Sequence, residues 1–155
     1  MPCKTAPATT ESEEPTAKTR RFDKIEYMDF FHVTVQTDTG PKKYLLISML
    51  DEWSGYAQAA VLEAATALEA KKAMSALWFK PYGAPRHLFC DPDSVFRSEE
   101  MRRMVQRYCT SLRTTAAESP WQHGRIERWH QTIRRMVQAT YRGLAEPGKF
   151  DIHDI

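Results

Sequence analysis

Residues 24–36 read KIEYMDFFHVTVQ, and this stretch has the two-residue repeat of a β-strand. The odd-numbered positions form an apolar face, made of Ile25, Tyr27, Phe31, Val33 and Val35. Asp29 falls on that same face. A carboxylate buried without a partner destabilises a fold by several kcal/mol. The pattern therefore predicts that Asp29 has a partner or binds a metal, unless the strand register differs and Asp29 lies at the strand end.

Two further strands follow this one. The segment TDTGP (37–41) is typical of a turn, with Gly40 available for a positive φ. YLLISML (44–50) is a nearly continuous apolar run, which indicates a buried central strand. YAQAAVL (56–62) is the third strand. The first half of the chain thus predicts an antiparallel meander.

The second half alternates between helical and extended patterns. Thr66 and Glu69 have the spacing of a capping box, and Ser98 can cap a later helix. The expected elements are a helix from Thr66 to PYGAP (81–85), a strand at 87–90, a helix after Ser98, a strand at 111–115 and a helix at 124–142. The order β-β-β-α-β-α-β-α predicts an α/β fold, with a five-stranded mixed sheet flanked by helices.

The length of 155 residues suits one domain. Residues 1–20 are rich in Pro, Thr, Ala and charge, so we expect a disordered N-terminal tail or linker. The domain is then expected at 21–145, with a short C-terminal tail at 146–155. No apolar run reaches the roughly 18 residues of a membrane helix. The N-terminus lacks a secretory pattern, so we expect neither membrane association nor secretion.

Positive charge is concentrated late in the chain. Residues 97–142 carry ten arginines and four glutamates, whereas the whole chain has a net charge of only +2. Such a segment suits a phosphate-rich partner. A pair of solvated surface helices would fit the charge count equally well.

Three acids stand where a simple core would not place them. Besides Asp29, these are Asp91, at the C-terminal tip of the strand 87–90, and Glu127, near the start of the last helix. Open α/β sheets bind ligands at such strand ends. Each acid also has an ordinary explanation. Asp91 precedes a proline and can serve a turn, and Glu127 can pair with Gln131 or Arg134 on its own helix.

Converging carboxylates stay ionised only when cations neutralise them. Ligand sets made only of oxygen favour Mg²⁺ or Mn²⁺. Two such ions about 3.5–4 Å apart are the recurring arrangement for phosphodiester chemistry.

Taken together, the acids and their surroundings resemble a known family. Between Asp91 and Glu127 lie 35 residues, as in the D,D-35-E signature. The blocks YMDFF, LDEWSGYAQAAVL, YGAPRHLFCD and SPWQHGRIERWHQTIRR also occur in the family's order, from about Phe22 to Arg142. The chain resembles the catalytic core of retroviral and LTR-retrotransposon integrases, which are DDE polynucleotidyl transferases.

The resemblance implies an RNase H-like fold and an enzyme with transferase and endonuclease activity. Asp29, Asp91 and Glu127 would bind two Mg²⁺ or Mn²⁺ ions. The reaction would be processing of element DNA at its 3′ ends, followed by strand transfer into target DNA. A homodimer or higher oligomer is implied, located in the nucleus for a eukaryotic retroelement and otherwise in the cytoplasm.

The resemblance also assigns DNA contacts, placing Gln131 and Arg134 against element DNA. Helical spacing independently aligns these residues with Glu127 on one side of the helix. We expect Arg125 and Arg128 to contact phosphates rather than bases. His123 either contacts DNA or caps the helix.

Two alternatives remain open at this stage. The second Asp is followed by Pro92-Asp93, where the family usually has Asn-Gly or Arg-Gly. That departure favours a decayed or domesticated fragment that keeps only nucleic-acid binding or dimerisation. A bacterial insertion-sequence transposase would share the same three acids.

Overall fold

The computed structural model describes residues 22, 24–37, 39–114 and 120–143, with side chains in the last range from Gly124 onward. The predicted tails at 1–20 and 146–155 lie outside these residues. The strands are β1 (Ile25–Thr37), β2 (Gly40–Asp51), β3 (Ala57–Leu62), β4 (His87–Cys90) and β5 (Ser111–Thr114). The helices are α1 (Ala67–Met74), η2 (Ser75–Phe79), α2 (Lys80–Tyr82), α3 (Glu99–Arg107) and α4 (Pro120–Gly143).

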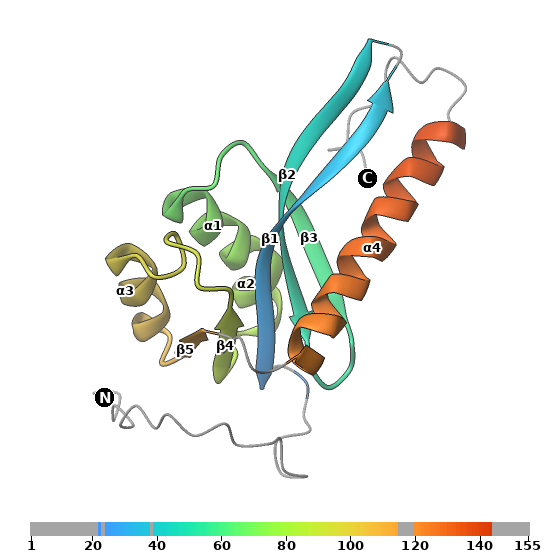
Figure 1. Ribbon diagram of the computed structural model, residues 1–155. Helices are drawn as coiled ribbons and strands as arrows, with labels where there is room; N and C mark the ends of the chain where they lie inside the picture. The colour runs from blue at the N-terminus through green and yellow to red at the C-terminus, as the bar shows by residue number, and fades with distance from the viewer. Residues whose placement is uncertain (1–21, 23, 38, 115–119, 144–155) are drawn as a thin grey trace.

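The five strands form one mixed sheet in the order β3-β2-β1-β4-β5 (Figure 1). β1, β2 and β3 pair antiparallel, whereas β4 pairs parallel to both β1 and β5. Gly40 opens β2 with φ of 117°, a backbone conformation that glycine adopts without strain. The predicted meander, mixed sheet and element order are confirmed.

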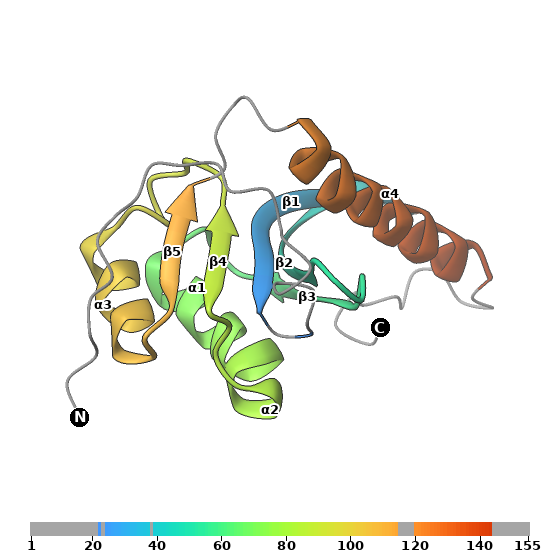
Figure 2. The same cartoon turned by 90° about the horizontal axis from the view of Figure 1, so that it is seen from below.

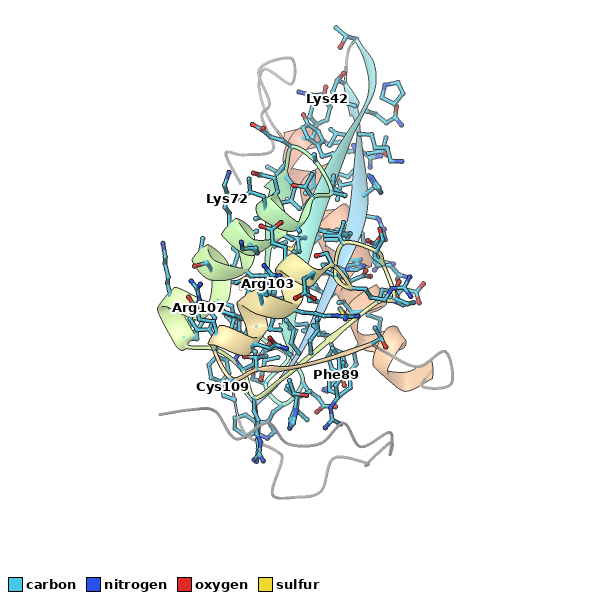
Figure 3. All side chains as sticks on the ribbon, turned by 90° about the vertical axis from the view of Figure 1, so that its left-hand side faces the viewer. Lys42, Lys72, Phe89, Arg103, Arg107 and Cys109 are labelled. Atoms are coloured by element: carbon cyan, nitrogen blue, oxygen red, sulfur yellow. The ribbon has the colours of Figure 1, made fainter. Side chains whose placement is uncertain are left out.

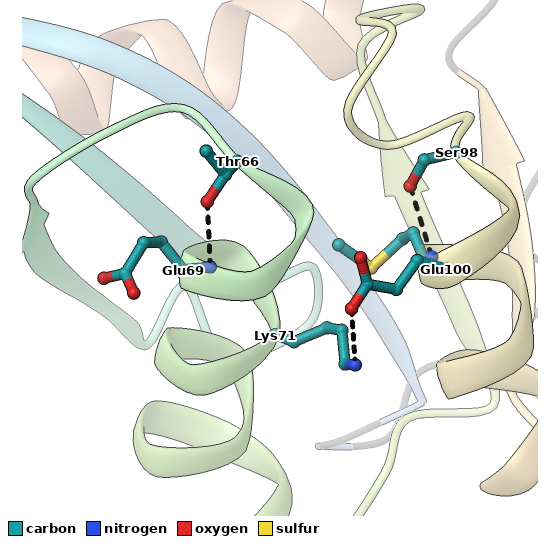
Figure 4. A network of polar contacts seen from close by, with 6 residues as sticks. Thr66, Glu69, Lys71, Ser98 and Glu100 are labelled. Atoms are coloured by element: carbon teal, nitrogen blue, oxygen red, sulfur yellow. Dashed lines mark hydrogen bonds and ion pairs between the residues drawn. The ribbon is translucent and has the colours of Figure 1, made fainter.

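Local capping fixes the helix starts that the sequence predicts. The Thr66 hydroxyl accepts a hydrogen bond from the backbone N–H of Glu69 at 3.2 Å. Ser98 does the same for Met101, also at 3.2 Å. An ion pair of 2.9 Å between Lys71 and Glu100 then links α1 to α3 (Figure 4).

Two helical features differ from the sequence prediction. The helix after Thr66 contains a π-helical turn, η2, that no local pattern indicated. α4 begins at Pro120 rather than at 124. Proline suits the first helical position because the N–H it lacks has no partner there. Within the described ranges, no helix is long and apolar enough to cross a membrane.

The helices cover opposite faces of the sheet (Figure 2). On one face, residues of α1, η2 and α3 pack with strand residues in a fully apolar cluster that includes Met28, Ile47 and Trp78. On the other face, α4 runs along β1. Its residues Ile133 and Val137 pack with the odd-numbered β1 residues. The apolar face predicted from the two-residue repeat is therefore the face that α4 covers.

Candidate active site

Asp29 and Asp91 follow directly from the pairing of β1 with β4. The parallel register runs from Ile25 opposite His87 to Met28 opposite Cys90. The next residue on each strand is Asp29 or Asp91. Carboxyl ends of neighbouring parallel strands lie at the same edge of a sheet. The Asp29 side chain is 26% exposed, and Asp91 is exposed.

The thiol of Cys90 lies within the electric field of the carboxylates at this edge. Burial raises its pKa to about 12, with further contributions from the carboxylates of Asp91, Asp29 and Asp93. These three acids therefore act electrostatically on one sulfur atom. The thiol also donates to the Arg113 carbonyl at 3.7 Å. A buried, protonated thiol is a poor nucleophile, so Cys90 has a packing role.

Glu127 lies on the turn of α4 that packs near the start of β1. Its neighbour Ile126 packs with Tyr27 and Leu50, which fixes this turn of α4 against the start of β1. Glu127 itself is exposed. It shares a helix face with Arg134, seven residues later, whose Nε donates to the His32 carbonyl of β1 at 3.0 Å. Glu127 is therefore on the side of α4 that faces the part of β1 not paired with β4.

The three predicted acids do not form a closed ligand set. Asp29 and Asp91 are brought together by strand register, while Glu127 stays exposed on the neighbouring helix. Among the residues that the structure describes, no three His, Cys, Asp or Glu side chains lie close enough to hold a metal ion. The available donors are carboxylate oxygens, which suit Mg²⁺ or Mn²⁺ chemically. Mutual repulsion opposes their closer approach without a cation.

A buried polar cluster lies beneath Asp29. The Nε2 atom of His130 on α4 is 2.8 Å from the Ser48 hydroxyl on β2. Its Nδ1 atom is 4.0 Å from Oδ2 of Asp29. The imidazole stacks on Phe31, with ring centroids 3.9 Å apart. Burial, and then the charge of Arg134, lower the pKa of His130 to about 4, so the ring is neutral near pH 7.

A basic groove of about 470 Å³ lies between α4 and β1. Its lining residues are His32, Thr34, Arg134, Arg135, Gln138, Ala139 and Arg142. β4 ends at Cys90, so β1 beyond Met28 has no β4 partner, and this uncovered part contributes His32 and Thr34. Helical spacing in the sequence could have indicated Arg142 as a residue of this basic surface. The β1 residues could not be predicted in this way, because they are accessible only where β4 has ended.

The remaining predicted DNA contacts have varied surroundings. Arg134, besides its bond to β1, stands over the Phe31 ring at 5.6 Å. The Nε atom of Arg128 donates to the Gly124 carbonyl at 3.0 Å, within its own helix. Gln131 is exposed. His123 belongs to α4, but its side chain lies outside the description.

Arg125 joins α4 to the β2–β3 turn. Its guanidinium donates to the Glu52 carbonyl, and the Tyr27 hydroxyl donates to the Glu52 carboxylate at 2.8 Å. Asp51 accepts hydrogen bonds of 2.6 Å from both the N–H and the hydroxyl of Ser54. Asp51 therefore has a turn role, and Arg125 also secures the start of α4 to the sheet.

No protein-family model matches the chain, and no curated protein matches it in sequence. The fold matches the magnesium-bound dimeric form of the HTLV-2 integrase catalytic core domain, with a TM-score of 0.64 and 21% identity over 77% of this chain and 72% of that one. The BIV integrase catalytic core domain gives a TM-score of 0.64 and 21% identity, over 78% and 72% of the respective chains.

A larger assembly also contains this fold. A chain of the simian T-cell lymphotropic virus intasome, in complex with PP2A regulatory subunit B56 gamma, gives a TM-score of 0.71 and 18% identity. The match covers 85% of this chain and 45% of that one. The described chain therefore has the RNase H-like fold of retroviral integrase catalytic core domains.

Proposed function

We propose that this protein is a divalent-metal-dependent polynucleotidyl transferase, an integrase catalytic core of a retroelement. The reaction is 3′-end processing of element DNA and transfer of the resulting 3′ ends into target DNA. The observation that carries this proposal is the register of β1 and β4, which sets Asp29 beside Asp91 at one edge of the sheet. The fold shared with integrase cores supports it.

Asp29, Asp91 and Glu127 are the residues that would hold Mg²⁺ or Mn²⁺. Bound ions at such a set supply Lewis-acid stabilisation of the attacking and leaving oxygens during phosphoryl transfer. Glu127 is exposed on α4 and has to join the two aspartates when cations offset their repulsion. The HTLV-2 core was solved in complex with magnesium, which agrees with this choice of ion.

DNA would bind along the groove between α4 and β1. Arg134, Arg135 and Arg142 supply positive charge there, and Gln131 and Arg128 are exposed on the same helix. Arginine pairs with phosphate oxygens in a bidentate geometry, which fixes the position of a duplex without reading its sequence. The groove lining includes Arg134, one helical turn beyond His130, and His32, three residues beyond Asp29. DNA in the groove would therefore lie near the carboxylates.

A disintegration assay tests the activity without knowledge of the element ends. The substrate is a branched oligonucleotide that mimics a strand-transfer product, incubated with Mn²⁺. We expect the wild type to release the branch by attack of a 3′-hydroxyl, and Asp91→Asn to be inactive. Asp91 is exposed, so the variant should fold normally, which circular dichroism checks.

A second function is a nucleic-acid-binding or dimerisation module without catalysis. The exposed position of Glu127 and the absence of a closed ligand set among the described side chains favour it. Absence of branch release in the wild type, together with retained DNA binding, would establish this module and contradict the transferase.

We also propose that the chain self-associates. The HTLV-2 core was solved in dimeric and trimeric forms. In this chain, Trp53, Tyr56 and Tyr82 are 56%, 40% and 38% exposed, and exposed aromatic side chains are enriched at protein interfaces. Sedimentation over a range of concentrations tests this. A monomer at all concentrations would contradict it.

A further inference from the structure

His130 stands between a buried hydroxyl and a candidate metal ligand. Its ring nitrogens face different partners, Ser48 at 2.8 Å and Asp29 at 4.0 Å. Ser48 and His130 are both buried, with 0% and 5% exposure. Phe31 holds the ring plane, since the two rings are within 9° of parallel. The imidazole therefore has little freedom to turn.

The two partners select the same tautomer. A neutral imidazole carries one proton, so only one ring nitrogen donates. A proton on Nε2 would leave the Nδ1 lone pair facing the negative Asp29 carboxylate. A proton on Nδ1 places a positive N–H dipole toward that carboxylate, while the Ser48 hydroxyl donates to Nε2. The distance of 4.0 Å exceeds a direct hydrogen bond, so the interaction with Asp29 is electrostatic.

We propose that Ser48 and His130 form a positioning pair, in which Ser48 fixes the Nδ1–H tautomer and His130 holds the Asp29 carboxylate for cation binding. The metal part of this inference rests on the proposed function. The tautomer part concerns only residues of the metal-free protein. Neighbours that orient metal ligands change metal affinity by about 10–100-fold when they are lost, and we expect the electrostatic contact of His130 with Asp29 to act in the same direction.

The pair is built from elements that meet only in the folded state. Ser48 lies opposite Asp29 in the β1–β2 register, and His130 is on α4, 82 residues after Ser48. One side of Asp29 thus faces the pair, while its side chain stays 26% exposed. The exposure of the side chain gives a cation access to the carboxylate.

Nitrogen-15 NMR of the full chain, recorded with chelator, reads the tautomer directly. The His130 signals are identified by their loss in His130→Gln. We expect a protonated Nδ1 and an unprotonated Nε2 in the wild type. Ser48→Ala should shift the population toward the Nε2–H form because the hydroxyl donor is gone. A wild-type ring protonated on Nε2 would overturn the inference.

Two nearly isosteric variants separate positioning from packing. The amide nitrogen of Asn reaches about as far as Nδ1, and that of Gln about as far as Nε2. His130→Asn can therefore keep a donor toward Asp29, whereas His130→Gln can keep only the contact with Ser48. We expect Mn²⁺ binding, measured by electron paramagnetic resonance, to weaken at least about tenfold in His130→Gln and less than about threefold in His130→Asn.

A structural role alone predicts the opposite ranking, because Gln preserves the buried contact with Ser48. Equal or tighter Mn²⁺ binding by His130→Gln than by His130→Asn would therefore overturn the positioning role. Thermal melting of both variants shows whether they are folded. Absence of Mn²⁺ binding in the wild type would contradict the proposed function instead, and the nitrogen shifts would still decide the tautomer.

Discussion

The two faces of the sheet are built differently. The face under α1, η2 and α3 carries a large apolar cluster, in which Met28, Ile47 and Trp78 are at most 1% exposed. It also buries two acids, Glu26 and Asp51, which are opposite each other at the start of β1 and the end of β2. The face under α4 contains the buried polar residues Ser48 and His130, and the half-buried Asp29 next to them. Both faces therefore bury polar groups, but the α4 face is the one on which a partly exposed carboxylate, Asp29, lies beside a buried histidine.

The surroundings of each polar group on the α4 face explain how it is accommodated. The pairing of β1 with β4 ends at Met28, one residue before Asp29. The Asp29 side chain therefore stays partly accessible to water, which makes its charge tolerable. Ser48 and His130 are fully inside, but they satisfy each other at 2.8 Å. A buried polar group with a partner avoids most of the desolvation penalty.

The largest effect is expected on the apolar face. Trp78→Ala removes a fully buried side chain and should lower the free energy of unfolding by about 3–5 kcal/mol. Chemical denaturation measures it. The control is Met136→Ala on α4, where the side chain is 54% exposed and a change within about 0.5 kcal/mol is expected. Equal losses in both would contradict the assignment of Trp78 to the buried core.

A loss of activity without loss of stability is expected on the α4 face. Glu127 is exposed, so Glu127→Gln should leave the free energy of unfolding unchanged. Branch release with Mn²⁺ should fall by more than about 100-fold, because loss of a ligand exceeds the effect of losing a residue that only orients it. The matched control, Glu63→Gln, changes another exposed glutamate and should be fully active. Full activity of Glu127→Gln would remove it from the site.

The groove should bind DNA through phosphates. The triple variant Arg134→Ala, Arg135→Ala, Arg142→Ala removes three lining arginines. We expect weaker binding and a slope of log affinity against log salt that is smaller by up to about three, roughly one per contact.

Arginines on the other face provide the control for this prediction. Arg103 and Arg107 are exposed on α3 (Figure 3), and Arg103 already pairs with Glu99 at 3.0 Å. Replacing both by Ala should change the salt slope little. A larger change in the salt slope for the α3 variant than for the groove variant would indicate that DNA binds at α3 instead.

The smallest effect concerns pH. Partial burial, Lys43 and Arg134 lower the pKa of His32, so this groove residue is neutral at pH 7.5. A bound phosphate favours the protonated form, so DNA affinity should rise as pH falls from 7.5 toward 5.5. His32 is exposed, which limits the gain to about two- to threefold. Fluorescence anisotropy should show a flatter pH profile for His32→Ala, and identical profiles would exclude His32 as the cause.

Features that depend on neighbouring residues were predictable. The alternating pattern of β1, the capping residues Thr66 and Ser98, and the turn at Gly40 all act within a few positions. The η2 turn and the early start of α4 at Pro120 were not predicted, since helix geometry there follows tertiary packing as well as propensity.

The candidate site divides in the same way. Asp29 and Asp91 could be selected because each interrupts or ends an apolar strand. The role of His130 could not, because nothing in the local sequence around it indicates Ser48 as its partner. The groove also joins residues of β1 to residues of α4 about 100 positions later.

Sequence alone was enough to predict the element order and the apolar faces, because side-chain period and local hydrogen bonding act over a few residues. The three acids were candidates chosen from their positions and from the spacing of the family signature. The tertiary contacts, in contrast, place Asp29 next to Asp91, set His130 against Ser48, and leave the described residues without a closed ligand set. These outcomes depend on strand register and on the docking of α4, which arise from burial of apolar surface along the whole sheet.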